Sequence, residues 1–346
     1  MPSKPQTVKP SALRPVIAHV DPFAAITGGE FHIRGQHLAM EGRPAVHMGN
    51  QDAHLVVAGN DYIIARVPDS AILGELQVET GALKSQIYST HLGIQVADSL
   101  HPVGSPAVDS EGNIFSTFSG SRGQKSPVSI YKIDSGFSSK PFVSDLMNPT
   151  GLAFDHEGLL YVSSRYDGVV YQITPTGNMS VYVEGMGVAT GIAFDEEENL
   201  YVGDRSGTIF KISRSRQIYV FATLEPSIAA YHLAFGPEGY LYVSGPTTSS
   251  FDAVNRISRA GEVEEFYRGL GRPQGIAFDA EGRLYVAASQ KGRRGVIRIN
   301  QDREAEFFLS GQGIVGLAFS PGGAMILATQ NALFRVDIGI AGRRLA

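Results

Sequence analysis

An all-β chain is what the sequence predicts, and three observations support that expectation. Glycine accounts for 40 of the 346 residues, well above the usual share of about 7%, which favours many tight turns. No apolar stripe with a period of 3.6 residues continues for more than two turns, so long amphipathic helices are not expected. One phrase also returns six times at intervals of about 40 to 46 residues: SPAVDSEGNIF (105–115), TGLAFDHEGLLYV (150–162), TGIAFDEEENLYV (190–202), HLAFGPEGYLYV (232–243), QGIAFDAEGRLYV (274–286) and VGLAFSPGGAMIL (315–327).

Each copy predicts four short strands. In the second copy an apolar run at 152–154 stops at the polar turn 155–158 and resumes at 160–162, which is typical of a β-hairpin. Further apolar runs at 169–173 and 179–183 supply two more strands. Six four-stranded antiparallel units in succession predict a six-bladed β-propeller, because neighbouring sheets then bury each other's faces.

The turns of the repeat carry acidic residues that look like catalytic pairs. Because they recur from copy to copy, we assign them to turn chemistry; they are Asp109, Glu111, Asp155, Glu157, Asp195, Glu197, Asp279 and Glu281. Gly158 and Gly282 are expected at positive φ. The third copy has Glu198 at this place, so its turn is expected to differ in form.

The sixth copy supplies only three strands, because the chain turns polar after the run 332–336. Residues 93–97, GIQVA, read as a strand without a partner of its own. We therefore expect 93–97 to complete the last blade and to join the start of the propeller, which spans 92–346, to its end.

Residues 1–13 are expected to form a flexible tail, since they contain Lys and Pro but no apolar segment typical of a signal peptide. The chain as given is thus expected in the cytoplasm, or in a secreted or periplasmic location if an export signal has been removed. Residues 14–91 predict a β-sandwich of short strands; these are 17–20, 30–33, 45–48, 62–65 and 76–78.

Composition excludes several functional classes. The absence of cysteine removes disulfides, thiolate metal sites and cysteine nucleophiles. A net charge of −5 argues against nucleic acid as a partner. No apolar run approaches the length of a membrane span, and the oligomeric state is not predicted.

The repeated phrase P-x-G-[LI]-A-F-D-x-E-G-x-L-Y-V, as at 149–162, resembles the NHL repeat and the senescence marker/gluconolactonase-like six-bladed propellers. Residues 14–91 resemble an IPT/TIG domain, an immunoglobulin-like sandwich, through Ile17-x-x-Val20-x-Pro22, the run from Gly28 to Leu38, and Val67-Pro68. That resemblance implies a spacer or contact domain in a bacterial chain. With seven Lys or Arg against eight Asp or Glu up to residue 92, no basic DNA-binding face is expected.

The gluconolactonase-like resemblance implies a ligand face at the central channel, with one residue from each blade: Gly104, Thr150, Thr190, His232, Gln274 and Val315. In that family a Glu, Asn residues and an Asp hold a divalent metal here. The matching positions in this chain are Gly104 for the Glu, Thr150 with Thr190 or His232 for the Asn residues, and Gln274 for the Asp. A ring without a carboxylate does not suit a hard cation, so we expect no metal and no other cofactor.

The candidate ligand-binding residues are therefore polar side chains of the ring, namely Thr150, Thr190, Tyr231, His232 and Gln274, with charge offered by Arg165, Asp204 and Arg205 on nearby loops. The loops 119–125, 246–252 and 290–295 are expected to rim the same face.

Two functional hypotheses follow. The first is a binding or interaction protein that takes a small polar, carbohydrate-like ligand or a protein partner at the channel face, with the family's metal site lost. The alternative is a metal-independent enzyme that uses His232 as general base, either a lactonase-like hydrolase or a lyase. The sequence places no nucleophile or orienting acid beside His232, which favours the first hypothesis.

Overall fold

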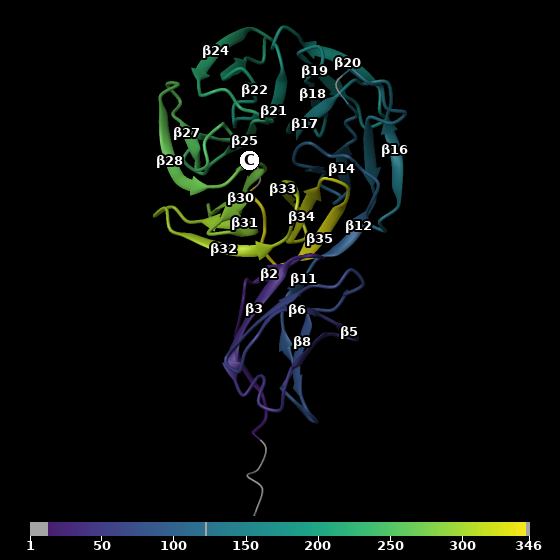
Figure 1. Cartoon of the computed structure of the whole chain (residues 1–346). Coiled ribbons are helices and arrows are strands. Elements are labelled where there is room, and N and C mark those ends of the chain that lie inside the picture. The colour runs from purple at the N-terminus through teal and green to yellow at the C-terminus, as the bar shows by residue number, and fades with distance from the viewer. Residues whose placement is uncertain (1–12, 122, 344–346) are drawn as a thin grey trace, which may run out of the picture. The chain divides into compact units, whose positions relative to one another are not determined.

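The computed structural model describes residues 13–121 and 123–343, so the expected tail at 1–13 lies outside the described residues except for its last one. Every regular element in these two stretches is a β-strand. The described chain accordingly contains no helix long and apolar enough to cross a membrane. The chain divides into two compact units, one up to Leu92 and one from Gly93 onwards (Figure 1).

The first unit contains two antiparallel sheets that share one apolar core. One sheet has the order β1 (Val16–Asp21), β3 (Glu30–Gln36), β7 (Tyr62–Arg66) and β6 (His54–Ala58). The other has the order β10 (Tyr88–Ser89), β8 (Glu75–Thr80), β4 (Ala45–Met48) and β5 (Gln51–Asp52), with β9 (Leu83–Lys84) also paired to β8. A short parallel pair links β2 (Ala24–Ala25) to β11 (His91–Leu92).

Alternation along these strands builds the core. Phe31, Ile33 and Ile63 come from the first sheet and Val46 and Leu76 from the second, and all five are buried in one cluster. Because successive strand residues point to opposite faces, every second residue of β3 enters this core. All five strands expected in residues 14–91 are present.

The second unit consists of consecutive four-stranded antiparallel sheets. In chain order they are β13 (Ala107–Val108), β14 (Ile114–Thr117), β15 (Ile130–Ile133), β16 (Ser139–Val143); β17 (Pro149–Phe154), β18 (Leu160–Ser164), β19 (Val169–Ile173), β20 (Met179–Val183); β21 (Ala189–Phe194), β22 (Leu200–Asp204), β23 (Thr208–Ile212), β24 (Ile218–Thr223); β25 (His232–Phe235), β26 (Leu241–Ser244), β27 (Asp252–Ile257), β28 (Val263–Leu270); β29 (Ile276–Phe278), β30 (Leu284–Gln290), β31 (Arg293–Ile299), β32 (Ala305–Ser310); and β33 (Ile314–Phe319), β34 (Ala324–Thr329), β35 (Leu333–Asp337) with β12 (Ile94–Ala97).

The two ends of the second unit meet in one sheet. β12 pairs antiparallel with β35, so that Ile94 lies opposite Arg335 and Ala97 opposite Leu333. This is the partner that the sequence analysis expects for residues 93–97. The pairing gives both strands main-chain hydrogen bonds that each would otherwise lack.

The sheets follow one another around a common centre (Figure 1). Their first strands touch in order, β13 with β17, then β21, β25, β29 and β33, and β33 touches β13 again. Glycine permits this approach: a Cβ on Gly151 would lie 2.4 Å from the carbonyl oxygen of Thr190, and one on Gly316 would lie 2.4 Å from that of Gly104. The glycine that opens the repeated phrase is thus required by the crowding of strands at the centre.

An aromatic pair recurs where successive sheets meet. In five of the six first strands, from β17 to β33, a Phe packs edge-on against an aromatic ring on the second strand of the preceding sheet, with ring centroids 4.8 to 5.4 Å apart. The pairs are Phe154 with Phe115, Phe194 with Tyr161, Phe235 with Tyr201, Phe278 with Tyr242 and Phe319 with Tyr285. Such pairs contribute about 0.5–1.5 kcal/mol beyond the area that they bury. The F and Y of the repeated phrase therefore hold neighbouring sheets together.

The acidic turn residues serve the hairpins, as predicted. The carboxylate Oδ1 of Asp155 accepts hydrogen bonds from the backbone N–H groups of Glu157 (3.0 Å) and Leu159 (2.9 Å). Asp109, Asp195 and Asp279 make the same pair of bonds in their own turns. Gly158 and Gly282 have φ values of 78° and 79°, which confirms the expected left-handed turn position.

The expectation for the third turn is wrong. Glu198 has φ 63°, and its N–H donates to Asp195 O at 3.1 Å just as that of Gly158 donates to Asp155 O at 3.1 Å. The Glu198 carboxylate lies 2.6 Å from His156 Nδ1 and forms an ion pair with Arg214. Glu198 thus adopts a backbone conformation that usually favours glycine, as do several other non-glycine residues of the described chain.

Candidate functional site

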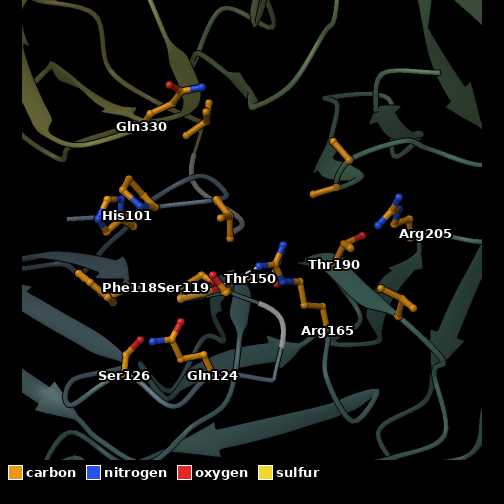
Figure 2. Close-up of a pocket in the computed structure, with 18 of the residues that line it drawn as sticks. His101, Phe118, Ser119, Gln124, Ser126, Thr150, Arg165, Thr190, Arg205 and Gln330 are labelled. Carbon is orange, nitrogen blue, oxygen red and sulfur yellow. Dashed lines mark hydrogen bonds between the residues drawn. The ribbon is translucent and has the colours of Figure 1, made fainter. Parts of the chain in front are cut away.

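A cavity of about 840 Å³ lies where the loops before the first strands and after the second strands converge. We call it the mouth. Its lining includes residues 101–103, 119–121 and 124–126, together with Thr150, Arg165, Thr190, Arg205, residues 228–230, Gln274, Val315 and Gln330. Figure 2 shows these side chains arriving from several separate sheets.

Two of the expected ring residues, Thr150 and Thr190, donate their hydroxyl protons to backbone carbonyl oxygens. The Thr190 hydroxyl donates to Gly203 O at 2.7 Å and accepts from the Tyr231 N–H at 3.1 Å. The Thr150 hydroxyl donates to Asn148 O at 3.2 Å. Both threonines are buried and line the mouth, but each can offer a ligand only an oxygen lone pair.

Gln274 and Val315 also line the mouth, as the sequence analysis expects. The main chain of Gln274 is fixed by bonds to neighbouring strands, since its N–H donates to Ala287 O at 2.8 Å and its carbonyl accepts from the Ser244 hydroxyl at 2.5 Å. The half-buried side chain of Gln274 therefore extends from a fixed main chain.

Two arginines enter the mouth from equivalent positions of neighbouring sheets. Arg165 directly follows β18 and Arg205 directly follows β22. An Arg165 terminal nitrogen, Nη2, donates to Ser119 Oγ at 3.3 Å and to Gly120 O at 3.4 Å. The Arg205 Nε donates to Ser227 O at 3.1 Å. In Figure 2 Arg165 extends toward Ser119 and Thr150, and Arg205 lies beyond Thr190.

Asp204 does not line the mouth, and its expected role as a charge offered to a ligand is wrong. It is buried at the end of β22. Its carboxylate accepts hydrogen bonds from the backbone N–H groups of Val188 (3.0 Å) and Ser206 (3.2 Å), and from the Ser206 hydroxyl at 2.5 Å. The group is occupied in ordering the turn that presents Arg205.

A residue that the sequence analysis did not single out organises the mouth. Asn148 is buried, and its Nδ2 donates to Gly120 O (3.0 Å) and Ser121 O (3.1 Å) while its Oδ1 accepts from the Gly123 N–H (2.9 Å). These bonds anchor the loop 119–125 against the start of β17. No sequence signal separates Asn148 from an ordinary turn residue, because its partners are backbone atoms of a distant loop.

Only one of the three expected rim loops contributes to the mouth. Residues 119–121, 124 and 125 of the first loop line it, whereas residues of 246–252 and 290–295 do not. In the latter loop Arg293 stacks over the Phe307 ring at 4.0 Å. His101 and Gln330 line the mouth instead. Gln330 directly follows β34, as Arg165 follows β18 and Arg205 follows β22.

Below the mouth the first strands enclose a second cavity of about 300 Å³, which we call the inner channel. Its walls are largely apolar and include Gly104 and Phe154, and it shares Thr150 and Ala230 with the mouth. Tyr231 and His232 line this inner channel rather than the mouth. The Tyr231 hydroxyl donates to Glu225 O, and burial raises the pKa of Tyr231 to about 12.

His232 is 5% exposed, and its Nε2 has no hydrogen-bond partner among the described residues. Burial lowers the pKa of this imidazole to about 4. The side chain is therefore neutral at pH 7 and a weak base there. Among the described residues no acidic group hydrogen-bonds its Nε2, and the shift in its pKa comes from burial and not from a charged neighbour.

The charged side chains that line the mouth in the described structure are all basic. Lys125, Arg165 and Arg205 line it together with His101, and the described lining contains no Asp or Glu. Within the described chain no cluster of three or more His, Asp or Glu side chains is arranged to hold a metal ion. The arrangement can hydrogen-bond polar groups and attract negative charge, but it does not present the anionic oxygens that a hard divalent cation needs.

No protein-family model matches this sequence, and no curated protein matches it either. Solved structures do resemble it. A putative gluconolactonase aligns with a TM-score of 0.60 at 16% identity over 73% of this chain and 94% of its own. An auxiliary nutrient binding protein from Bacteroides thetaiotaomicron aligns with a TM-score of 0.55 at 12% identity over 94% of this chain and 98% of its own.

A third similar structure is a catalytically inactive histidine-to-alanine variant of virginiamycin B lyase from Staphylococcus aureus with quinupristin. It aligns with a TM-score of 0.51 at 15% identity over 92% of this chain and 95% of its own. Identities this low relate folds, not activities. Together these structures support an all-β, propeller-type fold for this chain.

Proposed function

We propose that this protein binds a small polar, carbohydrate-like ligand in the mouth and performs no metal-dependent hydrolysis. The observation that carries this proposal is the mouth itself, a cavity of about 840 Å³ whose described lining combines hydroxyl, amide and cationic groups without a carboxylate. A volume of this size suits a small molecule. A hydrolytic metal site of the gluconolactonase-like kind would need anionic ligands at the ring positions held here by Gly104 and Gln274.

The finer architecture belongs to the same proposal. We infer a six-bladed propeller preceded by an immunoglobulin-like sandwich, with residues 93–97 as the closing strand of the last blade. The ring of first-strand contacts from β13 to β33 and the pairing of β12 with β35 support the blade number. Two sheets around one core support the sandwich, and we assign it the role of a spacer or second contact surface.

The similar structures are compatible with both hypotheses. The alignment with the nutrient binding protein extends over 94% of this chain, and the alignment with the lyase extends over 92%. The preference for binding therefore rests on the residues of the mouth and not on these alignments.

The alternative is a metal-independent hydrolase or lyase that uses His232. A general base works best when its pKa lies near the operating pH, and burial holds the pKa of His232 at about 4. A base in this position would also be expected to contact a nucleophile or an orienting acid, and the Nε2 of His232 contacts neither in the described residues. Binding therefore agrees better with the geometry.

A ligand screen with a blocked variant tests the proposal. Melting temperature is measured against a panel of sugars, sugar acids and lactones, with Ca²⁺, with Zn²⁺ and with a chelator, while product formation is followed by NMR. We expect a ligand to raise the melting temperature by mass action, no turnover, and no effect of metal or chelator. Ala229→Trp, which fills the mouth, should abolish the ligand effect, whereas Ala260→Trp in an exposed turn should not.

Turnover of a lactone that disappears in His232→Ala would establish the alternative instead. A ligand effect that survives in Ala229→Trp would place binding outside the mouth and contradict the proposal.

A further inference from the structure

We propose that the ligand of the mouth carries an anionic group, a carboxylate or a phosphate, and that Arg165 and Arg205 bind it as a pair. This inference rests on the proposed function, since it names the chemical class of ligand for the same cavity. It goes beyond that function because a polar cavity alone does not distinguish neutral from acidic sugars.

The first argument is the balance of charge. Of the cations that line the mouth, Lys125 already faces Asp145, with Nζ 3.4 Å from the carboxylate. Asp204, which precedes Arg205, accepts hydrogen bonds from Val188 and Ser206 and is not among the lining residues. The described lining thus presents cationic side chains to the cavity and no Asp or Glu.

The second argument is position. The residue that follows the second strand of each sheet faces the mouth in several repeats, and Phe118, Arg165, Arg205 and Gln330 hold this place after β14, β18, β22 and β34. Arginine appears at this place in two consecutive sheets, so the two guanidinium groups enter one side of the mouth. One anionic group can therefore contact both guanidinium groups, one from each of two neighbouring sheets.

Hydrogen bonds hold both arginine side chains in place. Arg165 is half-buried and donates to Ser119 and Gly120, and the Nε of Arg205 donates to Ser227 O. The structure gives the two terminal nitrogens of Arg205 no partner among the described residues. A guanidinium has five N–H donors in a rigid fork that matches a carboxylate or phosphate. Holding the side chain in advance lowers the entropy lost when the ligand binds.

These arguments favour an anion over a neutral sugar. Hydrogen bonds from a guanidinium to an ionised oxygen are roughly twice as strong as neutral ones. The hydroxyls of Thr150 and Thr190, by contrast, have already donated their protons to the chain. The donors that remain for a ligand in this part of the mouth are therefore mainly cationic.

The test compares matched probes that differ only in charge. Calorimetry measures dissociation constants at low and at high salt. D-galacturonate is compared with D-galactose, and D-glucose 6-phosphate is compared with D-glucose. Inorganic phosphate is measured as well. The variants are Arg165→Gln, Arg205→Gln and Arg165→Lys. Arg43→Gln, an exposed change of equal charge in the first unit, is the control.

We expect at least one acidic sugar to bind tenfold or more tightly than its neutral partner, and more weakly as salt rises. Each Gln variant should weaken that binding tenfold or more, Arg165→Lys should weaken it less, and Arg43→Gln should leave it within twofold. Preference for galacturonate would identify a carboxylate ligand, and preference for glucose 6-phosphate and inorganic phosphate a phosphate ligand. Melting curves of the unliganded variants show that each one folds.

Equal binding of the acidic and neutral sugars, or unchanged binding in both Gln variants, would overturn the anion inference while the proposed binding function stands. Failure of every anionic probe to bind at 10 mM would also overturn it. The proposed function would fall separately, through the Ala229→Trp comparison.

Discussion

Replacing His232 by Gln should make the protein less sensitive to acid. Burial lowers the pKa of His232 to about 4 in the fold, whereas a histidine in an unfolded chain titrates near 6.5. When the pH falls below about 6.5 the unfolded chain takes up this proton and the folded one does not, so acidification favours unfolding. The loss of stability begins near pH 6.5 and is complete near pH 4.

The size of the effect follows from the two pKa values. They differ by about 2.5 pH units, and each unit corresponds to about 1.4 kcal/mol. Over the whole window the protein should lose about 3 kcal/mol through this residue, and about 2 kcal/mol between pH 7 and pH 5. Gln keeps a polar side chain of similar reach and does not titrate.

Urea unfolding at pH 7 and pH 5 measures this difference. The wild-type chain should lose about 2 kcal/mol more free energy of unfolding over this interval than His232→Gln. Carboxylates titrate in both proteins and cancel, and a constant destabilisation of the variant does not enter a comparison of pH dependence. His54→Gln, an exposed histidine of the first unit, should behave as the wild type.

An equal loss in wild type and His232→Gln would refute the reasoning, as would an NMR titration of the His232 imidazole centred near pH 6.5. Either result would mean that water reaches the ring. Such a histidine would have the basicity that the hydrolase or lyase hypothesis requires, so this stability measurement also tests function.

Three further predictions concern the fold. Gly158→Val should lower the free energy of unfolding by about 1–3 kcal/mol, because a β-branched side chain is strained at φ 78°; Glu198→Gly in the equivalent turn should cost far less, and a similar loss in both would contradict the turn argument. Tyr242→Ala should cost about 3–5 kcal/mol, since the buried ring packs on Phe266 and Phe278, whereas Tyr242→Phe keeps both contacts and should cost about 1 kcal/mol in denaturant titrations. A chain that begins at residue 102 lacks β12 and leaves the edge of β35 unpaired, so it should melt lower and aggregate relative to one that begins at residue 90; identical melting and solubility would show that β12 is dispensable.

The repeated features of the structure were predictable from the sequence. Strand positions recur in all six copies, the left-handed glycine in five and the turn aspartate in four, because each sheet meets the same packing requirements. The closing strand could also be inferred, since the last copy lacks a strand and 93–97 lacks a partner. The exception is Glu198, which takes the same left-handed conformation as the turn glycines while its carboxylate contacts His156 and Arg214, and no repeat pattern reports such contacts.

The candidate site depends on residues that differ from copy to copy, and its details came only from the tertiary structure. The sequence analysis grouped Asp204 with Arg165 and Arg205 as charges near the ligand. In the structure the carboxylate of Asp204 accepts hydrogen bonds from the backbone N–H groups of Val188 and Ser206. The sequence analysis also placed His232 in one ring with Gln274, although the two line different cavities. A strand alternates its faces every residue, so a shift of one position moves a side chain from the mouth to the inner channel.

The sequence by itself thus determined the repeating all-β architecture, because the spacing of apolar runs and turns is local and recurs in six copies. The tertiary structure decided which polar groups remain available to a ligand. Hydroxyl protons of Thr150 and Thr190 are taken by carbonyl oxygens, and Asn148 orders a loop more than twenty residues away in sequence. Such bonds form between atoms that become neighbours only when separate sheets meet, which is why the cationic character of the mouth emerges from the fold and not from any single repeat.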